Sequence, residues 1–437
     1  MRELAVGLVV QVEFGSTNTF GFIVKKAPIP TFKTKSIAKD SEYRIPPQQV
    51  NTYLALTRLY PHSGQLIAQL FLPPQLNAAH AAPVSEGAIQ DLLPLNIEQQ
   101  NVYDSVLAKP ETSIIFGETG SGKTRLYTHL AKYYTDAGKT VVLLTPEIGL
   151  ASYIYHEMSP YFAQAMLYHS ELTKKQRADI WQHTATHNGG LLIIGPRSAL
   201  TLPLKNIGLI ILDEAHDQAY RQDSFPYVHA RTVAALLARE YKSYCLYGTA
   251  TPSVADIYNA KELGVPILRM DKLAVSSEHT AEIKVIAPDE GGRQVSGGLL
   301  LAPVREQLAE TFRQGNQAMI LINKRGTARY VSCETCGFEL RCKNCDHLLT
   351  YHHDTFKLMC HICGTSSKVP TACPDCGATT LSMRSLGAKA VEQEVLSLYP
   401  RVSIRRFDTD TSKKDHLSHY TNELKSGAIQ AIIGTQM

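Results

Sequence analysis

The sequence contains no long apolar run and no recognisable secretory leader. Across its 437 residues, no apolar stretch approaches the roughly 18 residues that a membrane-spanning helix needs. The opening stretch, MRELAVGLVVQVEFG, is interrupted by Glu3, Gln11 and Glu13, and this excludes a signal peptide. We therefore expect a cytoplasmic chain that has no membrane partner.

Internal repeats, low-complexity tracts and a strong excess of one charge are absent as well. Apolar residues make up 44% of the chain and charged residues 19%, a composition that supports a sizeable core and excludes global disorder. The net charge of +4 permits binding to nucleic acid but does not by itself indicate it. The length favours roughly two to four compact units.

Cysteine is scarce outside one window of the sequence. Of the 9 cysteines, Cys245 lies in an apolar segment and is expected to be a buried thiol, whereas the others form CxxC pairs. Without a secretory context, such pairs indicate metal ligands rather than disulfides. Tetrahedral Zn²⁺ takes four thiolates, so these pairs supply two closed, structural sites. The candidate ligands are Cys333, Cys336, Cys342, Cys345, Cys360, Cys363, Cys373 and Cys376.

The spacing of the pairs predicts how they divide between the two sites. The intervals between successive pairs are 5, 14 and 9 residues. The 14-residue interval suits a ribbon in which Cys342/Cys345 join Cys360/Cys363, and the outer pairs then close a second site around the first. Iron–sulfur ligation, redox chemistry and disulfides are the competing interpretations; regularly placed pairs favour two Zn²⁺ ions over them.

The middle of the chain alternates apolar runs with helical stretches. From residue 96 the runs are SIIFG, TVVLLTP, GLLIIG, IGLIILDEAH and YCLYGTATPS, and after residue 261 they are AMILINKRG, SIRRFDTD and AIIGTQM. Continuous apolar strands with interposed helices predict parallel α/β sheets. The N-terminal segment GLVVQVEFGSTNTFGFIVKK alternates apolar and polar residues instead and predicts short antiparallel strands. A helical pattern and an Ala- and Pro-rich linker at residues 76–94 follow it.

The segment GETGSGKT fits the pattern of a phosphate-binding loop between a strand and a helix. Its glycines let backbone N–H groups face a phosphate chain, and the helix N-terminus adds partial positive charge. We expect ATP as the cofactor, with Lys123 on the β/γ-phosphates and Thr124 on Mg²⁺. The candidate nucleotide-binding residues of this loop are Gly117, Glu118, Thr119, Gly120, Ser121, Gly122, Lys123 and Thr124.

An acidic pair ends another apolar strand, in the sequence ILDEAH. There Asp213 is expected to hold Mg²⁺, and Glu214 to orient and deprotonate the attacking water. The segment GTATPS follows a further strand, and its hydroxyl groups can link the nucleotide site to a neighbouring surface by hydrogen bonds. Each signal is weak alone, and their order along the chain makes the hydrolytic interpretation strong.

In that order these motifs resemble superfamily 2 helicases, and further segments narrow the resemblance. LTPEIGLA, HSELT, IIGPRSAL, DEAHDQAYRQ, INKRGTA, the CxxC pairs and GTQM together resemble the family of primosomal protein N′ (PriA), the bacterial replication restart helicases. The resemblance covers nearly the whole chain.

The resemblance implies an α/β fold with two RecA-like P-loop lobes, of which the second is incomplete, a small N-terminal β-rich DNA-binding domain and a double zinc-ribbon insert. The implied domains are 1–75 for 3′-DNA binding, the linker 76–94, lobe 1 at 95–260, and lobe 2 at 261–437 with the insert at 331–382. The implied activity is ATP-dependent 3′–5′ DNA unwinding in replication restart. The implied partners are forked and single-stranded DNA, 3′ ends, single-stranded-DNA-binding protein and the machinery that loads the replicative helicase.

The resemblance also implies roles for individual residues. Catalysis would rest on Lys123, Asp213, Glu214 and His216, and Gln99 would recognise adenine. Residues 217–231, the aromatic-rich loop, would couple single-stranded DNA to hydrolysis. In this loop the rings of Tyr220, Phe225 and Tyr227 would stack on bases, and Arg221 and Arg231 would meet phosphates.

The chain also departs from the family pattern. Ala215 replaces an acidic residue, Tyr227 and Val228 replace an Arg-Tyr pair, and residues 385–389 lose a Gly-rich match. The linker leaves no room for the winged helix of the family, and the sequence stops before the motif with the arginine finger. We therefore expect a fragment or truncated product, and the alternative is an ATP-binding scaffold that recognises DNA forks without efficient unwinding. An RNA helicase is disfavoured by the zinc insert.

Overall fold

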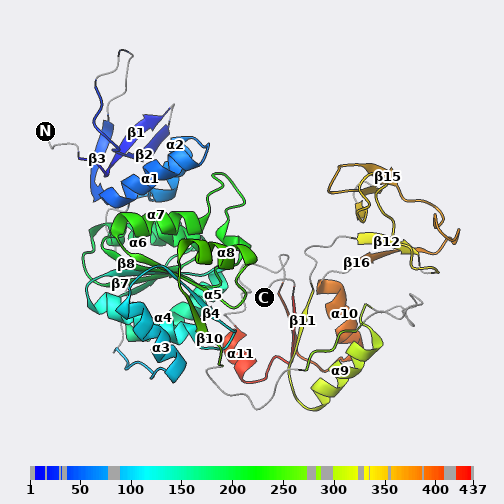
Figure 1. Cartoon of the computed structure of the whole chain (residues 1–437). Coiled ribbons are helices and arrows are strands. Elements are labelled where there is room, and N and C mark those ends of the chain that lie inside the picture. Colours follow the sequence, from blue (N-terminus) through cyan, green and yellow to red (C-terminus); the bar gives the residue numbers. More distant parts are fainter. Residues whose placement is uncertain are drawn as a thin grey trace. The chain divides into compact units, whose positions relative to one another are not determined.

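The computed structural model describes residues 5–14, 17–28, 31, 37–76, 89–272, 282–286, 299–322, 329–333, 335–352, 356–385, 388–407 and 420–434. They belong to two compact units that divide after Thr280 (Figure 1). In the part of the chain that the structure describes, no helix is both long and apolar enough to cross a bilayer.

The chain begins with a small antiparallel sheet covered by two helices. The strands are β1 (Leu8–Phe14), β2 (Thr17–Phe22) and β3 (Ile37–Arg44), in the order β2-β1-β3. The predicted antiparallel strands are therefore confirmed. The helices are α1 (Pro47–Leu59) and α2 (Gly64–Phe71), which lie beside the sheet in Figure 1.

The next sheet has seven strands, all parallel, in the order β10-β4-β9-β8-β5-β7-β6. The five strands that the sequence predicts are confirmed, whereas β6 and β10 are too short to give an apolar run. The bounds are β4 (Ser113–Gly117), β5 (Thr140–Leu144), β6 (Ala165–Leu167), β7 (Leu191–Gly195), β8 (Ile207–Leu212), β9 (Tyr244–Thr249) and β10 (Ile267–Met270).

Helices cover both faces of this sheet. Along β5, Val142 and Leu144 join one buried cluster and Val141 and Leu143 join the other, as alternation in a doubly covered strand requires. The helices are α3 (Ile97–Ala108), α4 (Lys123–Asp136), α5 (Ile148–Met158), α6 (Lys174–Thr186), α7 (Ala230–Tyr241) and α8 (Val254–Leu263), with short 3₁₀ turns η1 (Ser159–Tyr161), η2 (Arg197–Thr201) and η3 (Gln218–Tyr220).

The first lobe extends past its predicted end. The second lobe is predicted to start at residue 261, but β10 pairs with β4, so the chain still contributes to the first sheet as far as Met270. An edge strand of four residues gives no pattern that marks the boundary. Most of the predicted linker, residues 77–88, lies outside the described residues.

The N-terminal helices and sheet pack directly against the first lobe. The Trp181 indole N–H donates to the Phe71 carbonyl at 3.0 Å, and the Gln182 amide donates to the Tyr43 hydroxyl at 2.7 Å. The Gln49 amide donates to the carbonyl oxygen of Leu202. These three hydrogen bonds join the N-terminal helices and sheet to the first lobe, as expected for polar donors in a buried interface.

The second unit contains a three-stranded parallel sheet in the order β11-β18-β17. These three strands are the ones predicted from the sequence. The bounds are β11 (Ala318–Leu321), β17 (Ile404–Phe407) and β18 (Ala431–Gly434), with the helices α9 (Ala302–Arg313), α10 (Ala388–Leu398) and α11 (Thr421–Lys425). On α10, Ala388, Val391 and Val395 pack with Ile433 of β18.

The cysteine window forms an antiparallel sheet of its own, in the order β15-β14-β13-β12-β16. Its small core includes Val331, Leu340 and Leu358. The bounds are β12 (Arg329–Cys333), β13 (Thr350–His352), β14 (Lys357–Met359), β15 (Ser366–Lys368) and β16 (Leu381–Ser385).

Candidate nucleotide site, aromatic-rich loop and metal centres

The loop between β4 and α4 has the geometry of a phosphate cradle. Gly120 and Gly122 have φ of 87° and 82°, a region that favours glycine. The Lys123 ammonium donates to the carbonyl oxygens of Gly117 at 2.8 Å and Glu118 at 3.2 Å. The Ser121 hydroxyl is buried and has no hydrogen-bond partner among the described residues. A loop with an ammonium group, a helix N-terminus and an unpaired hydroxyl fits a phosphate chain.

Gln99 supports this loop from α3. Its amide nitrogen donates to the carbonyl oxygens of Ser121 at 3.2 Å and Gly122 at 3.3 Å, and its Oε1 accepts from the Asn96 N–H at 2.9 Å. The side chain is fully buried. The structure therefore shows Gln99 as a brace for the phosphate loop, and the adenine contact stays a prediction.

The acidic pair lies at the end of β8, the strand that neighbours β9 in the sheet. Asp213 is 6% exposed, and its Oδ1 accepts a hydrogen bond from the Tyr127 hydroxyl at 3.1 Å. Burial, followed by the charge of Glu214, raises the pKa of Asp213 to about 6, while Tyr127 and Lys123 act in the opposite direction. Glu214 has a φ of 45°, which is a strained backbone conformation for a residue other than glycine.

His216 connects the acidic pair to the GTATPS segment. Its Nδ1 lies 2.8 Å from the Thr249 hydroxyl and 3.6 Å from a Glu214 carboxylate oxygen. The Thr249 hydroxyl also accepts from the Thr251 N–H at 3.1 Å. The structure thus joins this segment to the acidic strand end through His216, and the predicted link to a neighbouring surface stays a prediction.

Tyr220 is buried, which contradicts its expected role as a stacking ring. It is fully buried, and its hydroxyl lies 3.0 Å from the Leu144 carbonyl oxygen and 2.5 Å from that of Asp213. The sequence shows an aromatic residue in a polar loop but not that it turns inward. Phe225 and Tyr227 are 60% and 45% exposed, so these two rings are accessible to a base.

The two predicted phosphate contacts also differ from each other. Arg221 is exposed. Arg231 is ion-paired with Asp256 and lies over the Tyr247 ring at 5.1 Å, so its guanidinium is already occupied. Whether either arginine meets DNA stays a prediction.

The aromatic-rich loop also contacts the N-terminal helices at the turn after α1, which was not predicted from the sequence. His62, in the turn after α1, accepts from the Tyr227 N–H at 3.2 Å, and the Tyr60 hydroxyl accepts from the His229 N–H at 3.2 Å. The His62 ring lies 4.9 Å from Phe225 and 6.0 Å from Tyr227. We call Tyr60, His62, Phe225 and Tyr227 the ring cluster. Its only signal in the sequence is the short Tyr-Pro-His turn.

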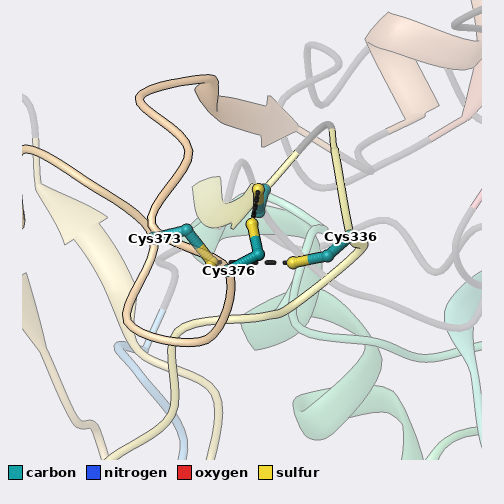
Figure 2. Close-up of side chains that lie close together, drawn as sticks. Cys336, Cys373 and Cys376 are labelled. Atoms are coloured by element: carbon teal, nitrogen blue, oxygen red, sulfur yellow. Dashed lines mark hydrogen bonds between the residues drawn. The ribbon is translucent and has the colours of Figure 1, made fainter.

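The eight clustered cysteines gather into two groups of four (Figure 2 shows one group). The groups are Cys333, Cys336, Cys373 and Cys376, and Cys342, Cys345, Cys360 and Cys363, with the ligand atoms of each group within 4.8 Å of one another. This confirms the predicted nested pairing. Cys245 is buried, and burial raises the pKa of its thiol to about 12.

The sulfur separations fit a tetrahedral metal. They are 3.6 Å for Cys333–Cys376 and for Cys336–Cys373, and 3.3 to 3.8 Å within the other group. Four sulfurs at about 2.3 Å from Zn²⁺ would lie about 3.8 Å apart, whereas a disulfide would bring two of them to about 2.05 Å. All ligand positions are filled by protein, which is typical of structural Zn²⁺ sites.

Comparison with known proteins agrees with this geometry. The DEAD/DEAH box helicase family matches residues 96–260. Replication restart protein PriA of Haemophilus influenzae is 35% identical over 353 residues, covering 80% of this chain and 48% of that protein. PriA of Chlamydia pneumoniae is 35% identical, covering 78% and 47%. The chain is thus similar to PriA proteins over most of its own length. PriA of Treponema pallidum is 29% identical over 100% of this chain and 67% of that protein.

The chain spans about half the length of most of the curated relatives named above. The segments INKRGTA and GTQM, which support the resemblance in sequence, fall mainly at residues 323–328 and 435–437, outside the described residues.

Proposed function

We propose that this chain is the ATP-hydrolysing motor of a replication restart DNA helicase. The observation that carries the proposal is that the phosphate loop, the acidic pair and the aromatic-rich loop meet at one end of the first lobe. Lys123 and Asp213 are close enough for the ammonium charge to lower the pKa of the carboxyl, and Tyr220 of the aromatic-rich loop reaches the Asp213 carbonyl. Asp213 is therefore both a residue of the hydrolytic site and a contact of the aromatic-rich loop.

The residues divide the hydrolytic step among them. The phosphate loop and Lys123 orient the β- and γ-phosphates. The Glu214 carboxylate takes a proton from the attacking water while the water oxygen bonds to the γ-phosphorus and the β–γ bridging bond breaks. Mg²⁺, when bound, would neutralise charge on the phosphate oxygens, with Thr124 and Asp213 as the residues placed to hold it. The two cysteine groups would hold two structural Zn²⁺ ions.

The wider assignments follow the family. We propose 3′–5′ movement on single-stranded DNA, recognition of 3′ ends at stalled forks by the N-terminal domain, and a cytoplasmic location. The proposed partners are forked and single-stranded DNA, single-stranded-DNA-binding protein and the loading machinery of the replicative helicase. The predicted domain limits are part of the same proposal, except that the first lobe extends to Met270 instead of residue 260.

The test is DNA-stimulated ATP hydrolysis by the wild-type chain and by Glu214→Gln. Loss of the general base should lower the rate by roughly 10²–10⁴-fold. Glu262→Gln, which changes an exposed carboxylate on α8, is the matched control and should hydrolyse ATP at the wild-type rate. Equal rates for wild type and Glu214→Gln would overturn the enzymatic assignment.

A second candidate is an ATP-binding scaffold that recognises forks without efficient unwinding. The observation in its favour is the occupied guanidinium of Arg231, which is paired with Asp256 instead of projecting from the loop. A scaffold would bind a forked DNA with normal affinity while the DNA leaves the hydrolysis rate unchanged. Competition between single-stranded DNA and RNA tests the RNA helicase alternative in the same assay.

A further inference from the structure

A cavity of about 530 Å³ lies between the N-terminal sheet and the first lobe. Its walls come from β2, from the chain at the end of α2, from η2 and from the aromatic-rich loop. The volume is in the range of sites that hold small ligands, roughly 300–1,000 Å³. No residue of the phosphate loop is among the described residues that line it.

The charged residues that line this cavity are both cationic. They are Arg177 on α6 and Arg197 at the start of η2, and no Asp or Glu is among the described residues that line it. Arg197 donates to the carbonyl oxygens of Ala219 at 2.8 Å and Arg221 at 3.0 Å, which fixes its guanidinium beside the aromatic-rich loop. The electrostatic character of the cavity therefore favours an anion.

Two polar atoms at the cavity are buried without a hydrogen-bond partner among the described residues. They are the Nε of Arg177 and the hydroxyl of Ser198. A buried donor without a partner costs about 1–3 kcal/mol, and more when the group is charged. An oxygen-rich anion that accepts from both residues would remove this cost.

Apolar side chains also line the cavity. They include Phe20, Leu70, Leu72 and Val228, and Tyr168 adds a second ring. An inorganic phosphate alone would leave this surface in contact with water. A ligand that carries both a phosphate and a flat, weakly polar group suits both the cationic and the apolar residues of the lining, because base–aromatic contacts are favourable for any base.

We propose that this cavity binds one nucleotide unit, with its phosphate on Arg177 and Ser198 and its base or sugar against Phe20 and other apolar residues of the lining. The proposal deepens the proposed function and rests on it. The nucleotide unit is either part of a DNA strand or a free mononucleotide, and the two sources share the same chemistry. The N-terminal domain and the motor would then hold the same ligand.

The test measures binding of a labelled single-stranded oligonucleotide without ATP at several salt concentrations. Arg177→Gln should weaken binding about tenfold and reduce the slope of log K against log salt by about 0.7, the value for one lost phosphate contact on a single strand. Ser198→Ala, a smaller change, should weaken binding about fivefold without changing the slope. Arg177→Lys should restore most of the slope.

Controls separate this site from general charge effects. Arg239→Gln removes an exposed cation on α7 and should leave affinity and slope unchanged. Competition with thymidine monophosphate distinguishes a free mononucleotide from a DNA strand as the ligand. If it displaces the oligonucleotide from wild type but not from Arg177→Gln, a free nucleotide suffices. If it displaces none, the site is assigned to a DNA strand.

Wild-type affinity and slope in folded Arg177→Gln and Ser198→Ala would overturn the cavity assignment. DNA-stimulated hydrolysis, measured on the same samples, would remain normal in that case. Loss of DNA-stimulated hydrolysis from the wild-type chain would instead count against the proposed function.

Discussion

Asp213 connects the nucleotide site to the aromatic-rich loop. Its carboxylate accepts from Tyr127 of α4, and its carbonyl oxygen lies by the hydroxyl of Tyr220. Gly248 faces the same place, where an added Cβ would come within 1.7 Å of the Tyr127 hydroxyl. The sequence identifies Asp213 through its motif, but it gives no signal for Tyr127, because a tyrosine inside a helix is usually a core residue.

The first prediction concerns this positioning residue. Tyr127→Phe removes the hydroxyl that donates to Asp213 and leaves the ring in place. Since that hydrogen bond lowers the pKa of Asp213, its loss should raise the pKa further and weaken the retention of Mg²⁺. We expect the Mg²⁺ concentration for half-maximal hydrolysis to rise severalfold and the free energy of unfolding to fall by about 1 kcal/mol.

The control for this variant is Tyr134→Phe, in the same helix. Tyr134 belongs to the same buried cluster. It should match wild type in Mg²⁺ dependence. An unchanged Mg²⁺ titration for Tyr127→Phe would show that the tyrosine is only a packing residue.

At the scale of elements, the aromatic-rich loop is held by the turn between α1 and α2. His62 and Tyr60 accept backbone N–H groups from Tyr227 and His229, so the N-terminal domain fixes the loop that contacts Asp213 through Tyr220. The loop therefore has one attachment in the catalytic strand and another in the N-terminal helices.

The second prediction tests that attachment. His62→Ala removes the acceptor for the Tyr227 N–H and the three ring contacts that His62 makes within the ring cluster. The loop should open more often, since a contact worth about 1 kcal/mol shifts a local equilibrium about fivefold. We expect faster cleavage in residues 222–228 in limited proteolysis and a higher DNA concentration for half-maximal ATPase stimulation.

His156→Ala provides the comparison, because His156 is exposed on α5. Its proteolysis pattern should match wild type. If His62→Ala also matched wild type in both assays, the contacts of the ring cluster would have no role in holding the loop.

Elements differ in how far the sequence could predict them. Long apolar runs such as Ile207–Leu212 identified the buried strands, because a parallel strand covered on both faces has few polar residues. β10 left no such signal, and the inward turn of Tyr220 and the bracing role of Gln99 depend on packing between distant segments. Motifs thus predicted which residues form the site, but not which of them are exposed.

At the scale of the whole molecule, the nested cysteine groups predict an order of metal loss. The outer group joins Cys333 to Cys376 across 43 residues, and the inner group joins Cys342 to Cys363 across 21. The inner site shortens the loop that the outer site must close, and loop closure is entropically less costly for shorter loops. Metal binding at the outer site should therefore depend on an intact inner site, whereas metal binding at the inner site should depend less on the outer site.

The third prediction follows from this order. Elemental analysis should give about two Zn²⁺ for the wild-type chain. Cys336→Ser, in the outer group, should keep close to one Zn²⁺ per chain. Cys342→Ser, in the inner group, should keep clearly less than one Zn²⁺ per chain. Cys245→Ser, which alters a buried thiol outside both groups, should keep the wild-type content. Equal losses in the two ligand variants would contradict the predicted dependence, and a wild-type content far from two would contradict both sites.

The chain contains 1 tryptophan, Trp181, and its position has a practical consequence. The indole is 1% exposed, and its N–H reaches across to Phe71 of the N-terminal domain. Intrinsic fluorescence of the unlabelled protein is therefore an optical reporter of a single interface. Separation of the N-terminal domain from the motor would expose this indole to water and shift its emission to longer wavelength, so a stopped-flow instrument could time that motion as DNA or ATP binds.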